Sequence, residues 1–541
     1  MRMRGILVTI LFFVLSDLVA QTGPAGIGTN DGTSALKLWL DAGKRVCNDS
    51  LGKKTAIDSE RVFYWEDQSG SKNSVWARTD STKPTFVQNN SYFNDQASVR
   101  FNRNKGKGNK RNSMSSTSFP YTNDITIFSV FHPLSVGGGN NVSPFQTKGI
   151  VSTDTSWYAG AGIVDADVGG KLNDICMAYN DTSLAAGGGD SVAKIDYSVK
   201  IPLGLKKTFI GVLEKQALSG LLSISQNGGI ASSYIGGKQP LNNSARYTIG
   251  STSNIIYGTD SVFFDGYISL AIVFNKKLSE AEMIIMNNYL SSKYAIPLSQ
   301  NDFFKMDEAL HGNYDHELAA IGMGNDGIAQ NDAKGEGIIE INKPSDLGKG
   351  EYLFWAHNSL SLNYQNQDFP DGVQQRLRRT WRVSEIGEAG KIDLTIDTRS
   401  FGSTDVKDLV LLVDADNDGL FDDETIGEGL FANATYVGNG KYKFSNIQLN
   451  NENRFTFGTL KPTCQTDCDA AFSPNADGVA DTYYAENVGK TVVYDKFGTT
   501  IKTLNTPTYW DGRKASGEMA TPGIYFVVTN ESQQKMVTLM R

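Results

Sequence analysis

The segment from Asp414 to Asp423 carries the clearest chemical pattern in this sequence of 541 residues. It reads Asp-Ala-Asp-Asn-Asp-Gly-Leu-Phe-Asp-Asp, so carboxylates stand at alternate positions and a glycine follows them. Carboxylate oxygens arranged around a sharp turn are the ligands that Ca²⁺ prefers. We therefore predict a calcium site made by Asp414, Asp416, Asp418, Asp422 and Asp423. A solvated acidic turn is the alternative interpretation.

This loop differs from the calcium loops that lie between two helices. Its twelfth position, counted from Asp414, is Thr425 rather than a bidentate Glu, and no helical pattern flanks it. The apolar run Leu409–Val413 leads into the turn as a strand. The segment resembles the Asp-rich calcium turns of extracellular repeat modules. This resemblance implies that a bound ion would stiffen the loop rather than catalyse a reaction.

The best-known hydrolytic motifs are absent from the sequence. The Glu-x-Asp-x-x-Glu motif of retaining laminarinases needs Asp two residues after Glu, and no Glu in the chain has that neighbour. His316 and Glu317 begin like a helical zinc motif, but Ala320 stands where the second His is needed. We therefore name no catalytic residue and expect a protein that is not an enzyme. A glycoside hydrolase with a different pair of carboxylates is the alternative.

Three aromatic residues are candidates for contact with a sugar ring. Sugar binding usually needs an exposed aromatic plane beside polar groups. Trp76, Trp157 and Tyr158 stand in polar, loop-like stretches, whereas Trp39 and Trp65 stand in strand patterns that predict core positions. Packing against neighbouring side chains is the alternative role for each of the three candidates.

The N-terminus has the three-part layout of a secretory signal peptide. A basic start is followed by the apolar block Ile6–Leu15 and by a small residue, Ala20, so we expect residues 1–20 to be removed. No later stretch approaches 18 apolar residues, and we expect no transmembrane segment. An exported chain meets an oxidising compartment, where Cys464 and Cys468 are a possible disulfide. Free thiols are the alternative.

Composition narrows the class of protein. Lys and Arg number 51 against 59 Asp and Glu, and a net charge of -8 lacks the basic field of nucleic-acid binders. Aromatic residues make up 10%, which is too many for a disordered chain. The 55 glycines separate short stretches rich in Tyr, Phe, Thr and Ser, and this pattern indicates β domains with many turns. The length predicts about three domains.

One helix is expected among the strands. Ser279 and Glu282 stand at capping-box spacing, and apolar residues at helical spacing follow as far as Leu290, before Pro297. We expect this helix to pack on the first sandwich and close it. The clearest predicted strands elsewhere are 36–41, 126–131, 208–213, 221–226, 263–274, 352–356, 391–396, 409–413, 491–494 and 523–528.

The C-terminal segment contains a specific series of motifs. Phe472–Gly478 reads Phe-Ser-Pro-Asn-Ala-Asp-Gly, and Trp510-Asp511-Gly512, a Pro-Gly-Ile-Tyr segment and a terminal Leu-Met-Arg follow it. This series resembles the gliding-motility-associated C-terminal domain of Bacteroidetes, the type B sorting domain of type IX secretion. Ala476 and Ala480 stand where that family usually has Gly and Asn. The resemblance implies a partner, the type IX secretion machinery, and these sorting residues: Pro474, Asn475, Asp477, Gly478, Trp510, Asp511, Gly512 and Arg541.

Two further regions resemble known modules. Leu36–Asp41, Trp65–Gly70 and Phe264–Ser279 make residues 35–298 similar to a concanavalin A-like (laminin-G-like) jelly roll. Members of that family bind glycans or proteins, and some hydrolyse glycans. Residues from about 312 to 460, with Trp355–Asn358, resemble a β-sandwich module that often follows this jelly roll in Bacteroidetes.

We therefore expect an all-β chain. It would comprise a signal peptide (1–20), a leader (21–34), a jelly roll with one capping helix (35–298), a second β-sandwich (299–460), a linker (461–468) and an immunoglobulin-like sorting domain (469–541). The expected function is a secreted or surface-bound binding or adhesion protein for glycans or extracellular polymers, with no nucleic-acid partner. A purely structural surface protein is a further alternative.

Overall fold

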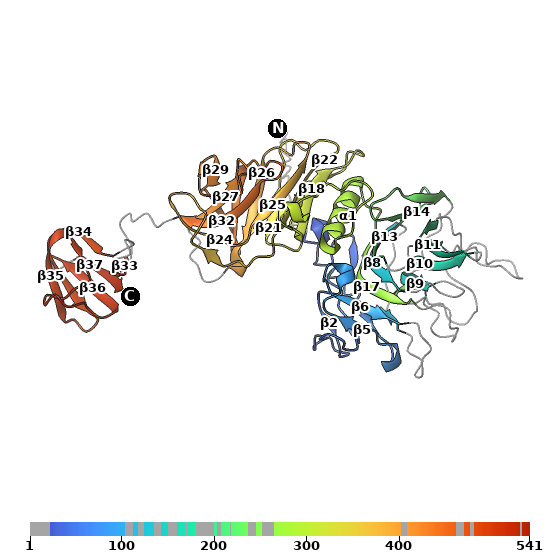
Figure 1. Cartoon of the computed structure of the whole chain (residues 1–541), viewed down its shortest axis with the longest axis horizontal. Coiled ribbons are helices and arrows are strands. Elements are labelled where there is room, and N and C mark those ends of the chain that lie inside the picture. The colour runs from blue at the N-terminus through green and yellow to red at the C-terminus, as the bar shows by residue number, and fades with distance from the viewer. Residues whose placement is uncertain are drawn as a thin grey trace, which may run out of the picture. The chain divides into compact units, whose positions relative to one another are not determined.

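Strands form most of the chain, because short apolar stretches alternate with turn residues along it. The computed structural model describes residues 22–102, 112–116, 124–134, 142–149, 160–168, 171–179, 200–202, 207–216, 218–235, 245–250, 264–401, 408–460, 470–475, 481–530 and 533–540. Within these ranges the strands are accompanied by one α-helix, α1 (Glu280–Tyr294), which confirms the predicted all-β class. The chain divides into two compact units, Met1–Leu460 and Lys461–Arg541, whose elements are labelled in Figure 1. The short 3-10 helices are η1 (Pro24–Gly26), η2 (Asp80–Thr82), η3 (Ser91–Phe93), η6 (Ala309–His311) and η7 (Thr398–Ser400).

The first part of the larger unit is a sandwich of two antiparallel sheets. The helix-side sheet has the order β15-β14-β13-β8-β17-β6-β5, and β1 also pairs with β17. The outer sheet has the order β12-β11-β10-β9-β16-β7-β4-β3-β2. The strands of the helix-side sheet are β1 (Leu36–Asp41), β5 (Thr85–Val87), β6 (Ser98–Phe101), β8 (Ile125–Pro133), β13 (Phe209–Gln216), β14 (Leu221–Gln226), β15 (Ser232–Ile235) and β17 (Gly266–Phe274). Those of the outer sheet are β2 (Val46–Cys47), β3 (Tyr64–Trp65), β4 (Val75–Trp76), β7 (Met114–Ser115), β9 (Val142–Gly149), β10 (Gly160–Val168), β11 (Lys171–Tyr179), β12 (Lys200–Pro202) and β16 (Ala245–Ile249).

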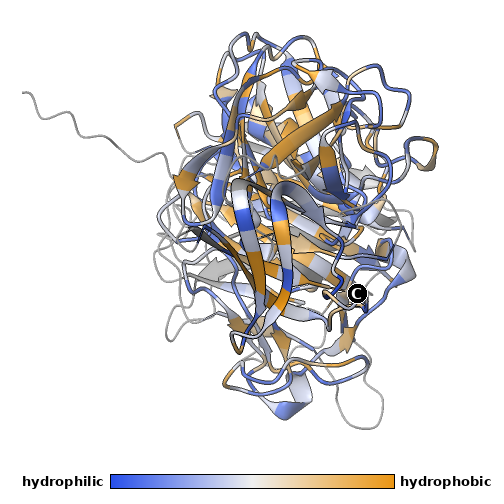
Figure 2. Ribbon diagram, turned by 90° about the vertical axis from the view of Figure 1, so that its left-hand side faces the viewer, coloured by the Kyte–Doolittle hydropathy of each residue, from blue (hydrophilic) through white to orange (hydrophobic). Residues whose placement is uncertain are grey.

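Alternation along the strands fills the space between the two sheets. Trp65 and Val75 are paired in the outer sheet and point into this space, where they meet Phe101 and Phe131 of the helix-side sheet. Figure 2 shows hydrophobic residues gathered mainly along the strands. The sandwich is therefore held by a conventional two-sheet core.

Helix α1 covers the opposite face of the helix-side sheet. Phe128 and Ile272 on that face belong to the same apolar core as Ile285 of the helix and Phe354 of the next region. The central strands β8 and β17 are thus buried on both faces, which explains why all nine residues of β8 are buried. The helix is enclosed as well, because twelve of its fifteen residues are buried. The predicted packing on the first sandwich alone understates this burial, since the middle region covers the other side of the helix.

The helix begins at the predicted capping box. The amide of Glu282 donates to Ser279 Oγ at 3.2 Å, and the amide of Ser279 donates to Glu282 Oε2 at 3.0 Å. Ala295, in the left-handed conformation, ends it. Asn288 then attaches the following segment, because its Oδ1 accepts from the amides of Phe303 and Phe304 at 2.8 and 3.0 Å. The first sandwich and the middle region are therefore joined through one helix.

A buried ion cluster reinforces this junction. Lys293 of α1 donates to Asp41 Oδ2, at the end of β1, at 2.5 Å. Glu336, which lies between β20 (Asp332–Ala333) and β21 (Ile339–Asn342) of the middle region, is 4.0 Å from Lys293 Nζ and 2.5 Å from Lys44 Nζ. The Tyr289 hydroxyl donates to Glu336 Oε2 at 3.3 Å. Charges from the sandwich, the helix and the middle region thus neutralise one another.

The middle region consists of a ten-stranded and a five-stranded sheet. Trp355, Trp381 and Phe457 of the larger sheet pack with Leu394 and Phe444 of the smaller one. The larger sheet contains β18 (His316–Met323), β19 (Ala329–Gln330), β22 (Glu351–His357), β23 (Tyr364–Gln365), β24 (Val373–Leu377), β25 (Trp381–Ile386), β27 (Leu409–Asp414), β28 (Thr425–Ile426), β29 (Gly429–Phe431) and β32 (Arg454–Leu460). The smaller contains β20 (Asp332–Ala333), β21 (Ile339–Asn342), β26 (Ile392–Asp397), β30 (Thr435–Gly438) and β31 (Lys441–Ile447).

The second unit is a five-stranded sheet with the order β33-β37-β36-β34-β35. The β33–β37 pair is parallel and the other pairs are antiparallel. One face of the sheet packs around Trp510, Phe472 and Tyr525. Its strands are β33 (Ala470–Phe472), β34 (Tyr483–Asp495), β35 (Thr500–Trp510), β36 (Gly523–Thr529) and β37 (Gln533–Leu539).

Candidate functional site

The buried strand β27 delivers Asp414 to the start of the Asp-rich turn. Asp414 is 1% exposed, whereas Asp416 and Asp418 are exposed. One carboxylate oxygen from each of the three lies within 4.8 Å of the others. The turn closes on Gly419, whose φ of 98° is in the left-handed region. Three of the five predicted ligands therefore share one small volume.

Hydrogen bonds hold the turn in this shape. The amide of Asp418 donates to Asp416 Oδ1 at 3.2 Å, and the amide of Leu420 donates to Asp418 Oδ1 at 2.7 Å. Asn453 Nδ2 donates to the Asp414 carbonyl at 2.8 Å and so links the turn to the residue before β32. These hydrogen bonds therefore connect the turn within itself and to the segment that leads into β32.

Asp414 is only partly satisfied. Its Oδ2 accepts from the amide of Gly419 at 3.1 Å and lies 3.5 Å from Arg454 Nη1. Its Oδ1 is buried and has no hydrogen-bond donor among the described residues. Burial raises the pKa of Asp414, although Arg454 opposes that rise. An unpaired buried carboxylate oxygen beside two further carboxylates fits a hard divalent cation such as Ca²⁺.

Glu424 is a fourth acidic residue that the sequence pattern did not indicate. It is 7% exposed, and its Oε1 accepts from the amide of Ala415 at 3.1 Å. Burial raises its pKa to about 7, and the charges of Asp423, Asp414 and Asp416 add to this rise. In the sequence, the only indication of this residue was that a carboxylate stands at the eleventh position counted from Asp414. Asp422 and Asp423 are exposed and lie outside the triad.

An aromatic pair lies on the outer sheet. Tyr64 and Trp76 are register partners on the sheet face away from the core, and their ring centroids are 5.6 Å apart. Both side chains are partly exposed. The Tyr64 hydroxyl donates to Ser74 Oγ at 2.9 Å. Trp76 thus presents a braced ring on a strand, although it was predicted in a loop. Trp157 and Tyr158, the other two candidates, lie outside the described residues.

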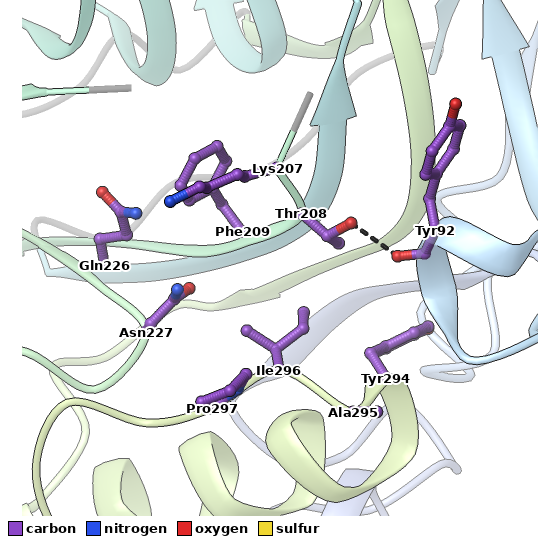
Figure 3. Close-up of a pocket in the computed structure, with 10 residues that line it drawn as sticks. All are labelled: Tyr92, Lys207, Thr208, Phe209, Gln226, Asn227, Tyr294, Ala295, Ile296 and Pro297. Atoms are coloured by element: carbon purple, nitrogen blue, oxygen red, sulfur yellow. Dashed lines mark hydrogen bonds between the residues drawn. The ribbon is translucent and has the colours of Figure 1, made fainter. Parts of the chain in front are cut away.

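A pocket of about 480 Å³ opens beside the C-terminal end of α1. Four segments that are distant in the sequence build it, and for that reason no sequence pattern announced it. The Thr208 hydroxyl donates to the Tyr92 carbonyl at 2.6 Å, while the Tyr92 ring points away from the pocket (Figure 3). The lining residues are Tyr92, Lys207, Thr208, Phe209, Gln226, Asn227, Tyr294, Ala295, Ile296 and Pro297.

The Tyr92 ring instead stacks on a buried histidine. The centroids of Tyr92 and His132 are 3.9 Å apart, and His132 Nδ1 lies 3.0 Å from Thr208 Oγ1. Since Thr208 gives its proton to a carbonyl, His132 Nδ1 carries the hydrogen in this contact. Burial lowers the pKa of His132 to about 4. The imidazole ring is therefore neutral at pH 7 and packs against Tyr92 behind the pocket-lining residue Thr208.

The truncated zinc motif lies on a strand. His316 and Glu317 belong to β18 rather than to a helix. Glu317 Oε2 accepts from His357 Nε2 at 3.0 Å, and His357 Nδ1 accepts from the amide of Ser359 at 2.9 Å. Burial lowers the pKa of His357, and Glu317 opposes this shift. This histidine is a satisfied buried residue.

The predicted sorting residues are placed in part by the structure. Trp510 is buried and its Nε1 donates to the Arg513 carbonyl at 2.9 Å. Asp511 accepts from Lys502 Nζ at 3.1 Å, and Gly512 has a φ of 70°. Pro474 and Asn475 lie just after β33, separated from it by Ser473. Other predicted residues lie outside the described part of the chain: Asp477, Gly478, Arg541, Cys464 and Cys468.

Residues 282–453 match a family model described as "Domain of unknown function (DUF8202)". The match begins inside α1 and ends just before β32, so it unites the helix with the middle region, as the shared core does. No curated protein is significantly similar to the chain. Within the described residues, no helix has the length and apolar character needed to cross a membrane.

Solved structures share only a distant β-rich likeness with the chain. Domain 4 of an extracellular arabinanase from Geobacillus stearothermophilus, in complex with arabinotriose, has a TM-score of 0.27 and 9% identity over 46% of this chain and 96% of that one. A Trypanosoma rangeli sialidase has a TM-score of 0.26 and 14% identity, and the match covers 53% of this chain and 37% of the sialidase. A pentraxin from Limulus polyphemus has a TM-score of 0.25 and 12% identity, and the match covers 34% of this chain and 78% of the pentraxin. TM-scores of this size support no functional assignment.

Proposed function

We propose that the protein binds glycans or similar extracellular polymers through the first sandwich. The observation that carries this proposal is the Tyr64–Trp76 pair on the outer sheet, with its rings 5.6 Å apart. A partly exposed indole braced by a second ring offers the apolar plane on which a sugar ring stacks. Beside it, Arg78 Nε donates to Ser115 Oγ at 3.2 Å, so polar groups border the rings.

The neighbourhood of the pair favours binding over hydrolysis. Glu66 stands two residues beyond Tyr64, directly after β3. Its Oε2 accepts from Arg45 Nε at 2.8 Å, so this carboxylate is already paired with a cation. A hydrolase needs one carboxyl as an acid and a second as a base or nucleophile. We therefore favour a binding protein.

Substituting Trp76 tests this proposal. The full chain is screened on a glycan array, and the affinity for the best ligand is then measured by calorimetry. We expect Trp76→Ala to raise Kd at least tenfold, about 1.4 kcal/mol. Tyr436→Ala is the control, because Tyr436 is 59% exposed and also pairs with a second tyrosine, 5.2 Å away in the middle region. Absence of any bound glycan, or an equal loss in both variants, would refute the proposal.

We further propose that residues 1–20 direct export and that the second unit is the address for type IX secretion. The support is the order of the N-terminal segment and the C-terminal motif series. The test expresses the chain, with and without residues 470–541, in a Bacteroidetes host that has this secretion system. Retention of only the truncated chain in the periplasm is expected. Equal release of both chains would exclude the address.

We propose that the Asp414 turn binds Ca²⁺ and that the bound ion stabilises the middle region. The support is the buried, unpaired Asp414 Oδ1 within the triad. Asp414→Asn removes one charge from the triad, whereas Asp422→Asn removes an exposed charge outside it. We expect calcium to raise the melting temperature of the wild type and of Asp422→Asn but not of Asp414→Asn. A wild-type melting temperature that changes with neither calcium nor chelator would refute this proposal.

A further inference from the structure

The pocket beside the end of α1 has walls that are tied together by backbone hydrogen bonds. The amide of Asn227 donates to the Ile210 carbonyl at 2.9 Å, and the amide of Ser299 donates to the Asn227 carbonyl at 2.8 Å. Ala295 at the helix end and Asn227 in the turn are both in the left-handed conformation. The segments from the helix end and the β14 end are therefore held in fixed relation, and the pocket is present before a ligand arrives.

Hydrogen-bond donors dominate the polar part of the lining. Asn227 Oδ1 accepts from the amide of Ile210 at 2.8 Å, which fixes the side-chain amide and leaves its NH₂ group without a partner among the described residues. Figure 3 shows the polar ends of Lys207 and Gln226 pointing toward one another at the rim. Gln226 Oε1 is buried and has no hydrogen-bond donor among the described residues, and Figure 3 shows the amide nitrogen of Gln226 on the side of Lys207. The Thr208 proton is already given to a carbonyl.

The charge of this pocket is distinctive. Among the described residues that line it, Lys207 is the one charged side chain, and no carboxylate is present. A second pocket, of about 440 Å³, contains Glu214, Glu280 and Asp326 against a single lysine, Lys277. A lysine next to two amide donors, without a competing carboxylate, attracts anionic oxygen atoms.

The remaining wall is apolar. Phe209, Ile296 and Pro297 line the pocket, and Figure 3 shows Ile296 and Pro297 on the side facing Lys207 and Gln226. A volume of about 480 Å³ lies in the range of small-molecule sites. The C–H face of a saccharide ring suits such a wall, while its anionic substituent reaches the donors.

We propose that this pocket binds an anionic sugar residue, with its carboxylate or sulfate group held by Lys207 and the amides of Gln226 and Asn227. The inference rests on the proposed glycan binding of the first sandwich and names a site and a ligand class for it. This site is separate from the Tyr64–Trp76 pair, so the two can be tested independently.

The experiment measures binding of the full chain to three probes: an oligogalacturonate, its neutral methyl ester and a sulfated galactan oligosaccharide. We expect the wild type to bind at least one anionic probe at least tenfold more tightly than the ester, and more weakly as salt rises. Lys207→Met should abolish the preference and flatten the salt dependence, while binding to the ester stays unchanged. The matched control is Lys391→Met, which removes an exposed lysine of the middle region.

Each outcome decides between the two proposals. A preference for the carboxylate or for the sulfate identifies the anionic group. An absent preference, or one that persists in Lys207→Met, overturns the anionic pocket. If the neutral ester still binds and Trp76→Ala weakens it, the proposed glycan binding stands without this inference. Absence of binding to every probe overturns the inference, and the glycan array then decides the proposed function on its own.

Discussion

Replacing Lys293 by Met tests the ion cluster that joins the first sandwich to the middle region. The substitution removes one positive charge and preserves most of the side-chain volume. Asp41, 2% exposed, loses the ammonium that donates to it at 2.5 Å, and Glu336 loses a charge 4.0 Å away. A buried carboxylate is then left without its closest partner.

The structure sets the size of the expected loss. Removing one partner of a buried ion pair typically costs about 3–5 kcal/mol, because the remaining charge stays desolvated. Two features place the expected loss at the lower end. The Lys293 side chain retains 16% exposure, and Lys44 also acts on Asp41. We therefore expect a loss of about 3 kcal/mol from the free energy of unfolding. The double variant Asp41→Asn/Lys293→Met should lose much less, about 1 kcal/mol.

Hydrogen exchange of peptides covering residues 280–294 measures this loss, because those amides report the opening of α1 itself. The matched control is Lys305→Met. Lys305 also pairs with an aspartate at 2.5 Å, but the side chains are 46% and 34% exposed, and such a surface pair contributes less than about 1 kcal/mol. A loss in Lys293→Met no larger than in the control would refute the ion-cluster argument.

The pH dependence gives a second criterion. Burial alone would raise the pKa of Asp41, but Lys293 and Lys44 outweigh it and hold that pKa below its ordinary value. This contribution is present above the unfolded pKa of about 4 and is lost as pH falls through the folded pKa. In Lys293→Met, burial raises the pKa of Asp41 because, of the two lysines, only Lys44 still opposes it. Protonation of Asp41 then removes the unpaired buried charge and restores part of the lost stability. The deficit should shrink between pH 7 and 5, and a pH-independent deficit would contradict this reasoning.

Three smaller perturbations test other parts of the chain. Burial lowers the pKa of His132 to about 4, so below pH 6.5 the folded state binds fewer protons than the unfolded state. The free energy of unfolding should therefore fall by up to about 3 kcal/mol between pH 6.5 and pH 4. His132→Asn should make the free energy of unfolding less dependent on pH in this range. Gly429→Ala should destabilise by at least about 1 kcal/mol more than Gly427→Ala in chemical denaturation. Both glycines have a similar left-handed φ, but only a Cβ at 429 would lie 2.7 Å from the backbone carbonyl oxygen of Val413, which cannot move aside as a side-chain end can. Trp510→Phe should lower the calorimetric transition of the second unit and leave that of the first unchanged, since its lost hydrogen bond is internal to the second unit.

Elements with strong local signals were predictable from the sequence. The capped helix is one example, because both hydrogen bonds of its capping box join residues three apart. The strand that ends at Asp414 is another, because its apolar run and the turn residues after it are contiguous. Strand β35 (Thr500–Trp510) was not predicted, since its outward residues are polar and it contains Pro507. The sheet pairing with β34 supplies the order that its own sequence does not indicate.

The acidic turn shows where local reasoning stops. The alternating aspartates are a property of contiguous sequence, and three of them do converge. Arg454, by contrast, reaches Asp414 because β27 and β32 are adjacent strands. Glu424 precedes β28, which pairs with β29, so its side chain lies against Gly429 and accepts from the amide of Ala415 in the turn. These contacts depend on strand order, which the spacing of residues does not encode.

Composition, turn residues and short-range periodicity were sufficient to establish an all-β chain with one capped helix, because those signals arise within a few residues. Burial of that helix on nearly every side, the ion cluster at its end and the pocket beside it could not be inferred in the same way. Each joins segments separated by tens to hundreds of positions: Asp41 with Lys293 and Glu336, and Tyr92 with Lys207 and Ile296. Such contacts form only when the sheets pack, so their chemistry becomes visible in the folded chain alone.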